Sequence, residues 1–255
     1  MDTPGERARI WPGSPVPSAP CSKVSAPVSG SVIVAAGAST RMRGTDKLWA
    51  DLDGAPLLAR TILAFQECAA VGKVAVVSAA ERVPDVRALC SALGLAKVEA
   101  VCTGGANRQE SVLAGLRALT DCTMVAVHDG GRPLVTPALI ERGLALARER
   151  GAALCAVPAK STHKLVDPEG RVLSTPPREQ LWEAQTPQVF RYAELLDAHT
   201  RAARAGATHT DDAALMEAAG HTVWVYEGSY RNIKVTTPED LPLVRALYAA
   251  RAPVS

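Results

Sequence analysis

The stretch SVIVAAGASTRM at residues 31–42, followed closely by Lys47, decides the fold class of this chain. Its first part is a short apolar run typical of a buried strand, and its second part is a loop of small residues that includes Gly37 and Arg41. Backbone N–H groups in such a loop can approach a polyphosphate, and the side chains of Arg41 and Lys47 can neutralise negative charge on it. The stretch therefore predicts a sheet strand that ends at a nucleotide triphosphate site.

Two common phosphate-binding loops are excluded by the spacing of this stretch. Ser39 stands where G-x-G-x-x-G needs a second glycine, and G-x-x-x-x-G-K-[ST] does not occur either. The loop is therefore neither an ordinary dinucleotide-binding loop nor a P-loop. On these residues alone, a solvated connection between a strand and a helix remains the alternative interpretation.

Length and composition fit one large α/β domain, because 255 residues with 47% hydrophobic content can bury a sizeable core. The balance of 28 basic and 26 acidic residues gives a net charge of +2, which argues against a broad nucleic-acid surface. No apolar run approaches the roughly 20 residues that span a bilayer. We therefore expect a cytoplasmic protein with a small anionic partner, no nucleic acid and no membrane.

Residues 1–30 contain six prolines and several serines, and they show almost no apolar periodicity. This composition predicts a disordered extension, so that residues 31–255 form the single folded domain. The six cysteines are isolated in the sequence and include no C-x-x-C pair, so we expect neither a disulfide framework nor a structural zinc site.

Short β-branched runs then alternate with Ala/Leu-rich segments, which predicts a doubly wound, mostly parallel α/β sheet of the Rossmann-like kind. The predicted strands are Ser31–Ala36, Val74–Ser78, Lys97–Val101, Met124–His128, Ala153–Val157 and Thr222–Tyr226. The predicted helices are Pro56–Ala70, Val86–Leu93, Gln109–Ala118, Pro137–Arg150, Tyr192–Ala205, Asp211–Ala219 and Pro238 to about Ala250.

Ligands of such sheets bind at the carboxyl ends of the strands, where this chain has glycine-containing loops with charged side chains. The Gly37 loop, residues 103–111 and residues 128–133 each follow a predicted strand. Asp129 could hold Mg²⁺ or a sugar hydroxyl there, and Arg132 beside it offers a fork for a phosphate. We expect these loops to converge on one crevice.

Residues 160–185 break the alternation of strands and helices with two short runs around an Asp-Pro-Glu-Gly turn at residues 167–170. The pattern predicts a projecting β-hairpin arm. Because an isolated two-stranded ribbon is marginally stable in water, a second subunit is its simplest partner. A mobile surface hairpin is the alternative.

An ordered set of motifs runs along the chain from Ser31 onward. It consists of Ala35-Ala36-Gly37, Arg41-Met42, Lys47, Gly104-Gly105, Arg108, Ser111, Val127-His128-Asp129, Arg132-Pro133, Thr186-Pro187-Gln188, Thr210-Asp211 and residues 232–240. Taken in order, these motifs resemble the 2-C-methyl-D-erythritol 4-phosphate cytidylyltransferase family. The resemblance implies the synthesis of 4-diphosphocytidyl-2-C-methyl-D-erythritol and diphosphate from CTP and the sugar-alcohol phosphate, in the non-mevalonate route to isoprenoids. It implies Mg²⁺, or another divalent cation, held chiefly by the triphosphate.

The resemblance also assigns roles to individual residues, with Arg178 contributed by a neighbouring subunit and Asp129 as a candidate neighbour of the metal. The catalytic residues it implies are Arg41, Lys47, Arg178 and Lys234. The nucleotide-binding residues are Ala35, Ala36, Gly37, Gly104, Gly105, Arg108 and Ser111. The residues implied to bind the second substrate are Asp129, Arg132, Thr162, Thr186 and Thr210. We expect His128 to be structural, because attack by a phosphate on a phosphate needs no proton abstraction.

Three other functions share part of this pattern: ribitol 5-phosphate cytidylyltransferase, molybdenum-cofactor nucleotidyltransferase and a non-catalytic nucleotide-binding protein. The sequence departs from the family pattern at Ser39, Ala106, Gly130-Gly131 and Ser161. Of these, Ala106 and Ser161 affect positions next to the expected nucleotide or sugar contacts. Thr186-Pro187-Gln188 and residues 232–240 count against the molybdenum-cofactor alternative.

Overall fold

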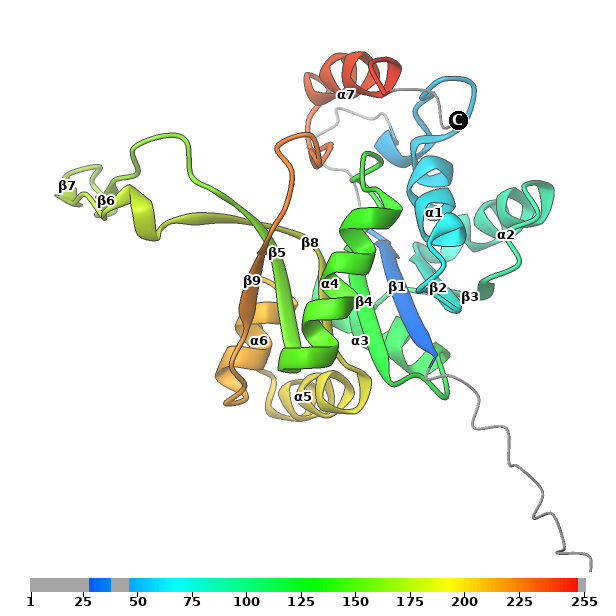
Figure 1. Cartoon of the computed structure of the whole chain (residues 1–255), viewed down its shortest axis with the longest axis horizontal. Helices are drawn as coiled ribbons and strands as arrows, with labels where there is room; N and C mark the ends of the chain where they lie inside the picture. The colour runs from blue at the N-terminus through cyan, green and yellow to red at the C-terminus, as the bar shows by residue number, and fades with distance from the viewer. Residues whose placement is uncertain (1–27, 38–45, 252–255) are drawn as a thin grey trace, which may run out of the picture.

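A seven-stranded sheet forms the centre of the molecule, in a computed structural model that describes residues 28–37 and 46–251 (Figure 1). The strand order is β3-β2-β1-β4-β8-β5-β9, and β8 runs antiparallel to both of its neighbours while the other pairs are parallel. The doubly wound, mostly parallel α/β fold expected from the sequence is thereby confirmed. The strands are β1 Ser29–Ala35, β2 Lys73–Ser78, β3 Val98–Thr103, β4 Met124–Asp129, β5 Ala152–Pro158, β8 Trp182–Arg191 and β9 Trp224–Glu227.

Helices cover both faces of the sheet because the inner strands are apolar on both sides. In β1, Ile33 packs into the core that contains α1, α2, α4 and α7, whereas Val32 packs into the core that contains α3, α5 and α6. Both side chains are fully buried, and such burial contributes about 1.5–3 kcal/mol for each. The helices are α1 Leu57–Glu67, α2 Val83–Ala92, α3 Arg108–Ala118, α4 Pro137–Arg150, α5 Tyr192–Ala205, α6 Asp212–Ala218 and α7 Asp240–Ala249.

The ends of several elements differ from the sequence-based expectation. β1 begins at Ser29, so the last residues of the predicted extension belong to the sheet. Residues 1–27, and with them most of that extension, lie outside the described residues, as do Ser39 and Arg41.

Within the part of the chain that the structure describes, none of the helices combines the length and apolar character needed to cross a membrane.

The sequence pattern did not predict β8, which lies in the middle of the sheet between β4 and β5. Pro187 lies inside β8, and a proline normally argues against a central strand because it cannot donate to the ladder. Here the pairing of β5 with β8 shifts register between Leu154 and Ala156, opposite this part of β8. The irregular pairing accommodates the proline, which the pattern of β8 alone could not show.

The predicted hairpin is present as β6 Leu165–Val166 and β7 Val172–Ser174, which pair antiparallel and project from the body of the molecule between β5 and β8 (Figure 1). Asp167 organises its turn by accepting a hydrogen bond from the backbone N–H of Arg171 at 2.7 Å. The arm is shorter than expected, because residues 182–185 belong to β8. Within them, residues 182–184 pair with the end of β5 in the main sheet.

Candidate active site

A cleft opens at the carboxyl ends of β1 and β4, beside the loop that follows β3. Its volume of about 350 Å³ lies within the range typical of small-molecule sites. The three loops that we expected to converge do so here, joined by Lys47 and Lys234 from distant parts of the sequence. The lining residues are Val34, Ala35, Ala36, Gly37, Lys47, Leu48, Gly105, Ala106, Asn107, Arg108, Ser111, Asp129, Gly131, Lys234 and Thr236.

One side of the cleft is made largely of backbone, because side chains are missing where the loop after β3 meets β1. A Cβ atom on Gly104 would lie 2.7 Å from Ser111 Oγ and would collide with the Cβ atom of Ala36. Ser111 Oγ accepts a hydrogen bond from the backbone N–H of Gly105 at 3.2 Å, which fixes the glycine pair. The N–H group of Gly104 is bonded to the carbonyl of Ser78 at 2.8 Å, so this side of the cleft offers a ligand close approach to the backbone.

Helix α3 begins at the cleft and is capped by Asn107, whose side chain accepts a hydrogen bond from the backbone N–H of Glu110 at 2.9 Å. Glu110 in turn accepts from the backbone N–H of Ala106 at 2.9 Å. The amino end of a helix carries a partial positive charge that favours anions. This end of the cleft is therefore suited to a phosphate, and Ala106 contributes its backbone rather than an acidic side chain.

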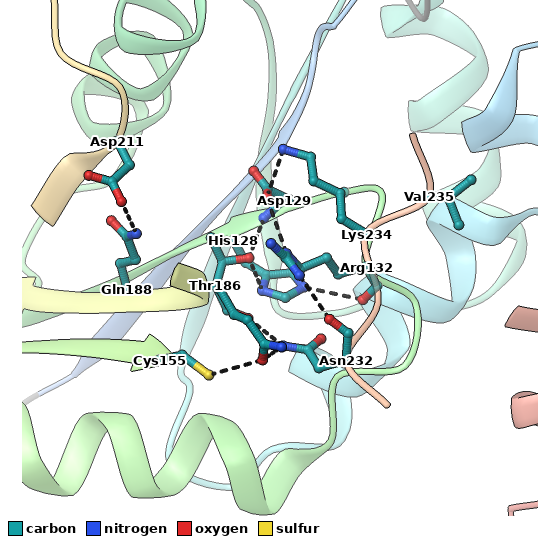
Figure 2. A network of polar contacts seen from close by, with 12 residues as sticks. His128, Asp129, Arg132, Cys155, Thr186, Gln188, Asp211, Asn232, Lys234 and Val235 are labelled. Carbon is teal, nitrogen blue, oxygen red and sulfur yellow. Dashed lines mark hydrogen bonds and ion pairs between the residues drawn. The ribbon is translucent and has the colours of Figure 1, made fainter. Parts of the chain in front are cut away.

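Three cations surround the carboxylate of Asp129 at the end of β4, and Figure 2 shows two of them, Lys234 and Arg132. Lys234 Nζ lies 3.0 Å from Asp129 Oδ2, and Arg132 Nε lies 3.3 Å from the same oxygen. Arg108 Nε is 3.6 Å from Oδ1. Burial of Asp129 opposes its ionisation, but the nearby charges of Lys234, Arg108 and Arg132 outweigh burial and hold the pKa of the carboxyl group well below its usual range.

Arg108 is also fixed from behind by a buried carboxylate at the start of α6. Its Nη2 lies 2.7 Å from Asp212 Oδ2, and Asp212 Oδ1 lies 3.0 Å from His199 Nε2 on α5. Burial by itself would lower the pKa of Arg108, but the charges of Asp212 and Asp129 raise it further above its ordinary value. Arg108 therefore remains charged and points toward the cleft in a set orientation.

A network of buried polar groups supports Asp129 from the side away from the cleft (Figure 2). Thr186 Oγ1 accepts a hydrogen bond from the backbone N–H of Asp129 at 3.1 Å and lies 2.9 Å from His128 Nδ1. Asn232 donates through Nδ2 to the carbonyl of Thr186 at 2.8 Å, and its own carbonyl accepts from Arg132 Nη1 at 2.8 Å. The network ties β4, β8 and the loop after β9 into one unit that orients Arg132.

His128 is part of this support and does not face the cleft. It is fully buried beside Phe65, with 5.1 Å between the ring centroids. Burial lowers the pKa of His128 to about 3, although the charge of Asp129 opposes the shift. The imidazole is therefore neutral at physiological pH, and its position agrees with the structural role expected from the sequence.

Lys47 and residues 234–236 line the cleft next to the loop after β4. Lys47 Nζ donates a hydrogen bond to the carbonyl of Val235 at 2.8 Å, and the backbone N–H of Val235 donates to the carbonyl of Gly131 at 2.8 Å. Both lysines of the cleft are thereby held close to the site where the loops after β1 and β4 meet.

Several residues predicted to bind substrate lie away from the cleft in this chain. Thr186 is buried behind Asp129, and Thr210 is exposed just before α6. Thr162 and Arg178 are exposed on the arm, where Arg178 Nη1 donates to the carbonyl of Lys160 at 3.4 Å. Arg41 lies outside the described residues. The substrate-binding and catalytic roles of all five remain predictions.

Sequence reasoning missed the partners that hold the predicted residues in place. Asn232 stands in a motif that we singled out, and a buried asparagine beside Lys234 could have been assigned a positioning role. Asp212 and His199 gave no usable signal, because the contact between Asp212 and Arg108 joins residues 104 positions apart.

Known proteins that are similar to this chain belong to one family. A sequence profile of the 2-C-methyl-D-erythritol 4-phosphate cytidylyltransferase (IspD) family matches residues 30–249. A protein of that name from Dehalococcoides mccartyi is 46% identical over 218 residues, which cover 86% of this chain and 95% of the relative.

Solved structures agree in both fold and family. The crystal structure of 2-C-methyl-D-erythritol 4-phosphate cytidylyltransferase from Thermus thermophilus superposes with a TM-score of 0.71 at 33% identity, covering 86% of this chain and 98% of the other. The structure of 4-diphosphocytidyl-2C-methyl-D-erythritol synthase from Anaerococcus prevotii gives a TM-score of 0.78 at 25% identity, covering 88% and 97% respectively.

Proposed function

This chain belongs to the 2-C-methyl-D-erythritol 4-phosphate cytidylyltransferase family, and on that premise we propose how its cleft performs the reaction. The enzyme transfers the cytidylyl group of CTP to 2-C-methyl-D-erythritol 4-phosphate, in the non-mevalonate pathway to isoprenoids. The observation that carries the mechanism is the convergence of Arg108, Arg132 and Lys234 on one carboxylate, Asp129, at the edge of the cleft.

The reaction joins two anions, so its main barrier is electrostatic. An oxygen of the methylerythritol phosphate attacks the α-phosphorus of CTP and forms a new P–O bond. The bond between the α-phosphorus and the bridging oxygen breaks, and diphosphate leaves with the electron pair. No proton has to be abstracted, so positioning and charge neutralisation supply the catalysis.

We assign the nucleotide to the side of the cleft formed by the loops after β1 and β3. The loop of residues 35–37 and the amino end of α3 would hold the base, ribose and phosphates of CTP, and the glycine pair 104–105 would leave room for them. Lys47 projects from the opposite side, where its charge offsets the negative charge that grows on the phosphates during the reaction. Arg41 is assigned the same role from the family resemblance.

Asp129 acts in this proposal as the counter-ion that arranges the cations before substrate arrives. A buried carboxylate that contacts three cations fixes their side chains and lowers the reorganisation needed on binding. The phosphate of the second substrate would then exchange contacts with Lys234 and Arg132 while Asp129 keeps them oriented.

The residues of the cleft fit a divalent cation held mainly by the triphosphate. Asp129 is the one carboxylate among the lining residues that the structure describes, and no group of three metal-ligating side chains occurs in residues 28–37 and 46–251. Mg²⁺ is commonly bound by one or two carboxylates together with substrate phosphates, which this arrangement matches. When bound, the cation would neutralise phosphate charge and orient the leaving diphosphate.

We further propose that the enzyme is a cytoplasmic homodimer joined through the arm. Leu165, Val166, Val172 and Leu173 on the arm are each more than half exposed, which is unusual for adjacent apolar side chains in a protein that remains monomeric. Pairing through this surface would cover them and would deliver Arg178 and Thr162 to a partner's cleft.

Diphosphate release from CTP and Mg²⁺ tests the activity directly, with methylerythritol 4-phosphate and ribitol 5-phosphate compared as acceptors. We expect strong preference for methylerythritol 4-phosphate. Preference for ribitol 5-phosphate, or release with neither acceptor, would contradict the proposed function.

Mixing Arg178→Ala with Lys47→Ala protein tests the dimer, because a heterodimer with shared sites regains one intact site, whereas a fully active monomer would refute sharing.

A further inference from the structure

A second and larger hollow lies between α1, α4 and the end of α7, away from the cleft. It has a volume of about 900 Å³. Leu63, Leu134 and Leu139 are among the apolar side chains of its wall, and Arg142, Arg231 and Arg251 are among its charged ones. A surface that combines an apolar wall with several guanidinium groups differs from an ordinary packing defect, which would be apolar throughout.

Three of the four arginines that line this hollow form no ion pair with an acidic group of the described residues. The guanidinium groups of Arg142 and Arg231 donate hydrogen bonds to the carbonyls of Glu227 and Leu247, at 2.9 and 2.7 Å. Glu67 is the acidic residue of the hollow, and its charge acts on Arg251. Arg60, the fourth arginine of the lining, has its Nη2 atom 3.7 Å from Asp53 Oδ2, outside the hollow. The other three arginines against one glutamate leave an excess of two positive charges.

Arg251 shows most clearly that a partner is missing. Its Nη2 atom is buried and has no hydrogen-bond partner in the described structure. The guanidinium lies over the ring of Tyr248, 5.1 Å from the centroid, which holds it at the hollow. Burial lowers the pKa of Arg251; Tyr248 and Glu67 oppose this shift, and the nearby charge of Arg231 adds to it. An anion between these two side chains would satisfy the orphaned N–H group and offset their repulsion.

We propose that this hollow binds a soluble phosphate monoester with an apolar chain, whose phosphate lies between Arg231 and Arg251. A phosphate monoester carries up to two negative charges near neutral pH, which matches the excess of two positive charges. Guanidinium groups bind phosphate through paired N–H donors, and the leucine side chains of the wall accommodate the apolar chain. The site is separate from the catalytic cleft, and the inference does not depend on the proposed catalytic function.

The loop that contributes Arg231 to the hollow also carries two residues of the active-site region. Asn232 supports Arg132, and Lys234 contacts Asp129. A ligand that fixes Arg231 would therefore restrain the segment on which Lys234 depends.

Isothermal titration calorimetry with n-octyl phosphate tests the proposal, with inorganic phosphate and n-octyl glucoside as the anionic and apolar halves of the probe. We expect n-octyl phosphate to bind at least about tenfold more tightly than either half, because only it uses both the arginines and the apolar wall. Equal binding of the glucoside would show a merely apolar patch and would overturn the proposal, as would no measurable binding of n-octyl phosphate.

Matched variants then locate the probe. Arg231→Met and Arg251→Met should each weaken n-octyl phosphate binding by about tenfold or more, whereas Arg204→Met, which removes an exposed arginine of α5, should leave it unchanged. Thermal unfolding without ligand verifies that each variant folds. The unfolding midpoint of Arg251→Met should be no lower than that of the wild type, because the Nη2 atom that it removes has no hydrogen-bond partner among the described residues. Binding that survives Arg251→Met unchanged would refute the site. Binding that saturating CTP with Mg²⁺ abolishes by competition would place the probe in the catalytic cleft and would also refute it.

Discussion

Replacing His128 by Asn should reduce the loss of unfolding free energy that the protein undergoes as the pH falls below about 6.5. The imidazole is fully buried and its pKa lies at about 3, below the ordinary value of 6.5 that it regains on unfolding. Between these values the unfolded chain binds a proton that the folded protein does not. The folded pKa is the depressed one, so the contribution of His128 to stability is complete above about pH 6.5 and falls as the pH decreases toward 3.

The size of this effect follows from the pKa difference. Each pH unit below 6.5 costs about 1.4 kcal/mol while the folded imidazole stays neutral, so at about pH 5 the wild-type protein should have lost about 2 kcal/mol through this residue. The His128→Asn variant has no imidazole and cannot lose this contribution of about 2 kcal/mol on acidification. At neutral pH it should be less stable than the wild type by about 1–3 kcal/mol, because Thr186 and the carbonyl of Arg132 lose their contact with the imidazole.

Urea unfolding followed by circular dichroism at about pH 7.5 and about pH 5 measures both quantities. The difference between the two pH values should be about 2 kcal/mol smaller in His128→Asn than in the wild type. His163→Asn, which removes an exposed imidazole of the arm, is the matched control. If His128→Asn and the wild type lose the same stability between the two pH values, the buried neutral imidazole is refuted.

Further predictions concern the cleft. Lys47→Ala should lower kcat by about two to three orders of magnitude and leave the circular dichroism spectrum unchanged, since one cation on the phosphates is lost; an unchanged kcat would remove Lys47 from the mechanism. Gly105→Ala should raise KM for CTP, because the added Cβ would collide with Glu110, which caps the loop beside the nucleotide; an unaltered KM would place the base elsewhere. Asp129→Asn should destabilise the protein by about 1–3 kcal/mol near neutral pH, since three cations lose their counter-ion. That penalty should shrink as the pH falls below about 4, where unfolding protonates the wild-type carboxyl group, whose folded pKa is depressed; a pH-independent penalty would contradict the assigned charge cluster.

The sequence predicted best those features that depend on neighbouring residues. Helix α4 has its predicted bounds because Thr136 caps it, Pro137 occupies its first turn and Gly151 ends it, all within one short stretch. The loops around the cleft were predicted for a related reason, since each directly follows an apolar strand and a parallel sheet gathers such ends at one edge.

Features that depend on distant partners were not predictable in this way. β8 carries Pro187 and little alternation, and its place at the centre of the sheet depends on two strands elsewhere in the chain. Thr186 illustrates the same limit, because its sequence context indicated a ligand contact whereas the structure places its hydroxyl group against the backbone of Asp129. Family resemblance locates a residue in a motif but does not show which way its side chain points.

The hydrogen bond from Lys47 to the carbonyl of Val235 has a consequence for synthesis of the protein, because it joins residues 188 positions apart. Domains emerge from the ribosome amino end first, and contacts of long sequence separation form late. The sheet edge made by β1, β2 and β3 can form early, but a nascent chain cannot complete the cleft until Val235 has emerged. Catalytic competence therefore cannot arise before Val235 has been synthesised, and nascent chains that end before it are unable to consume CTP.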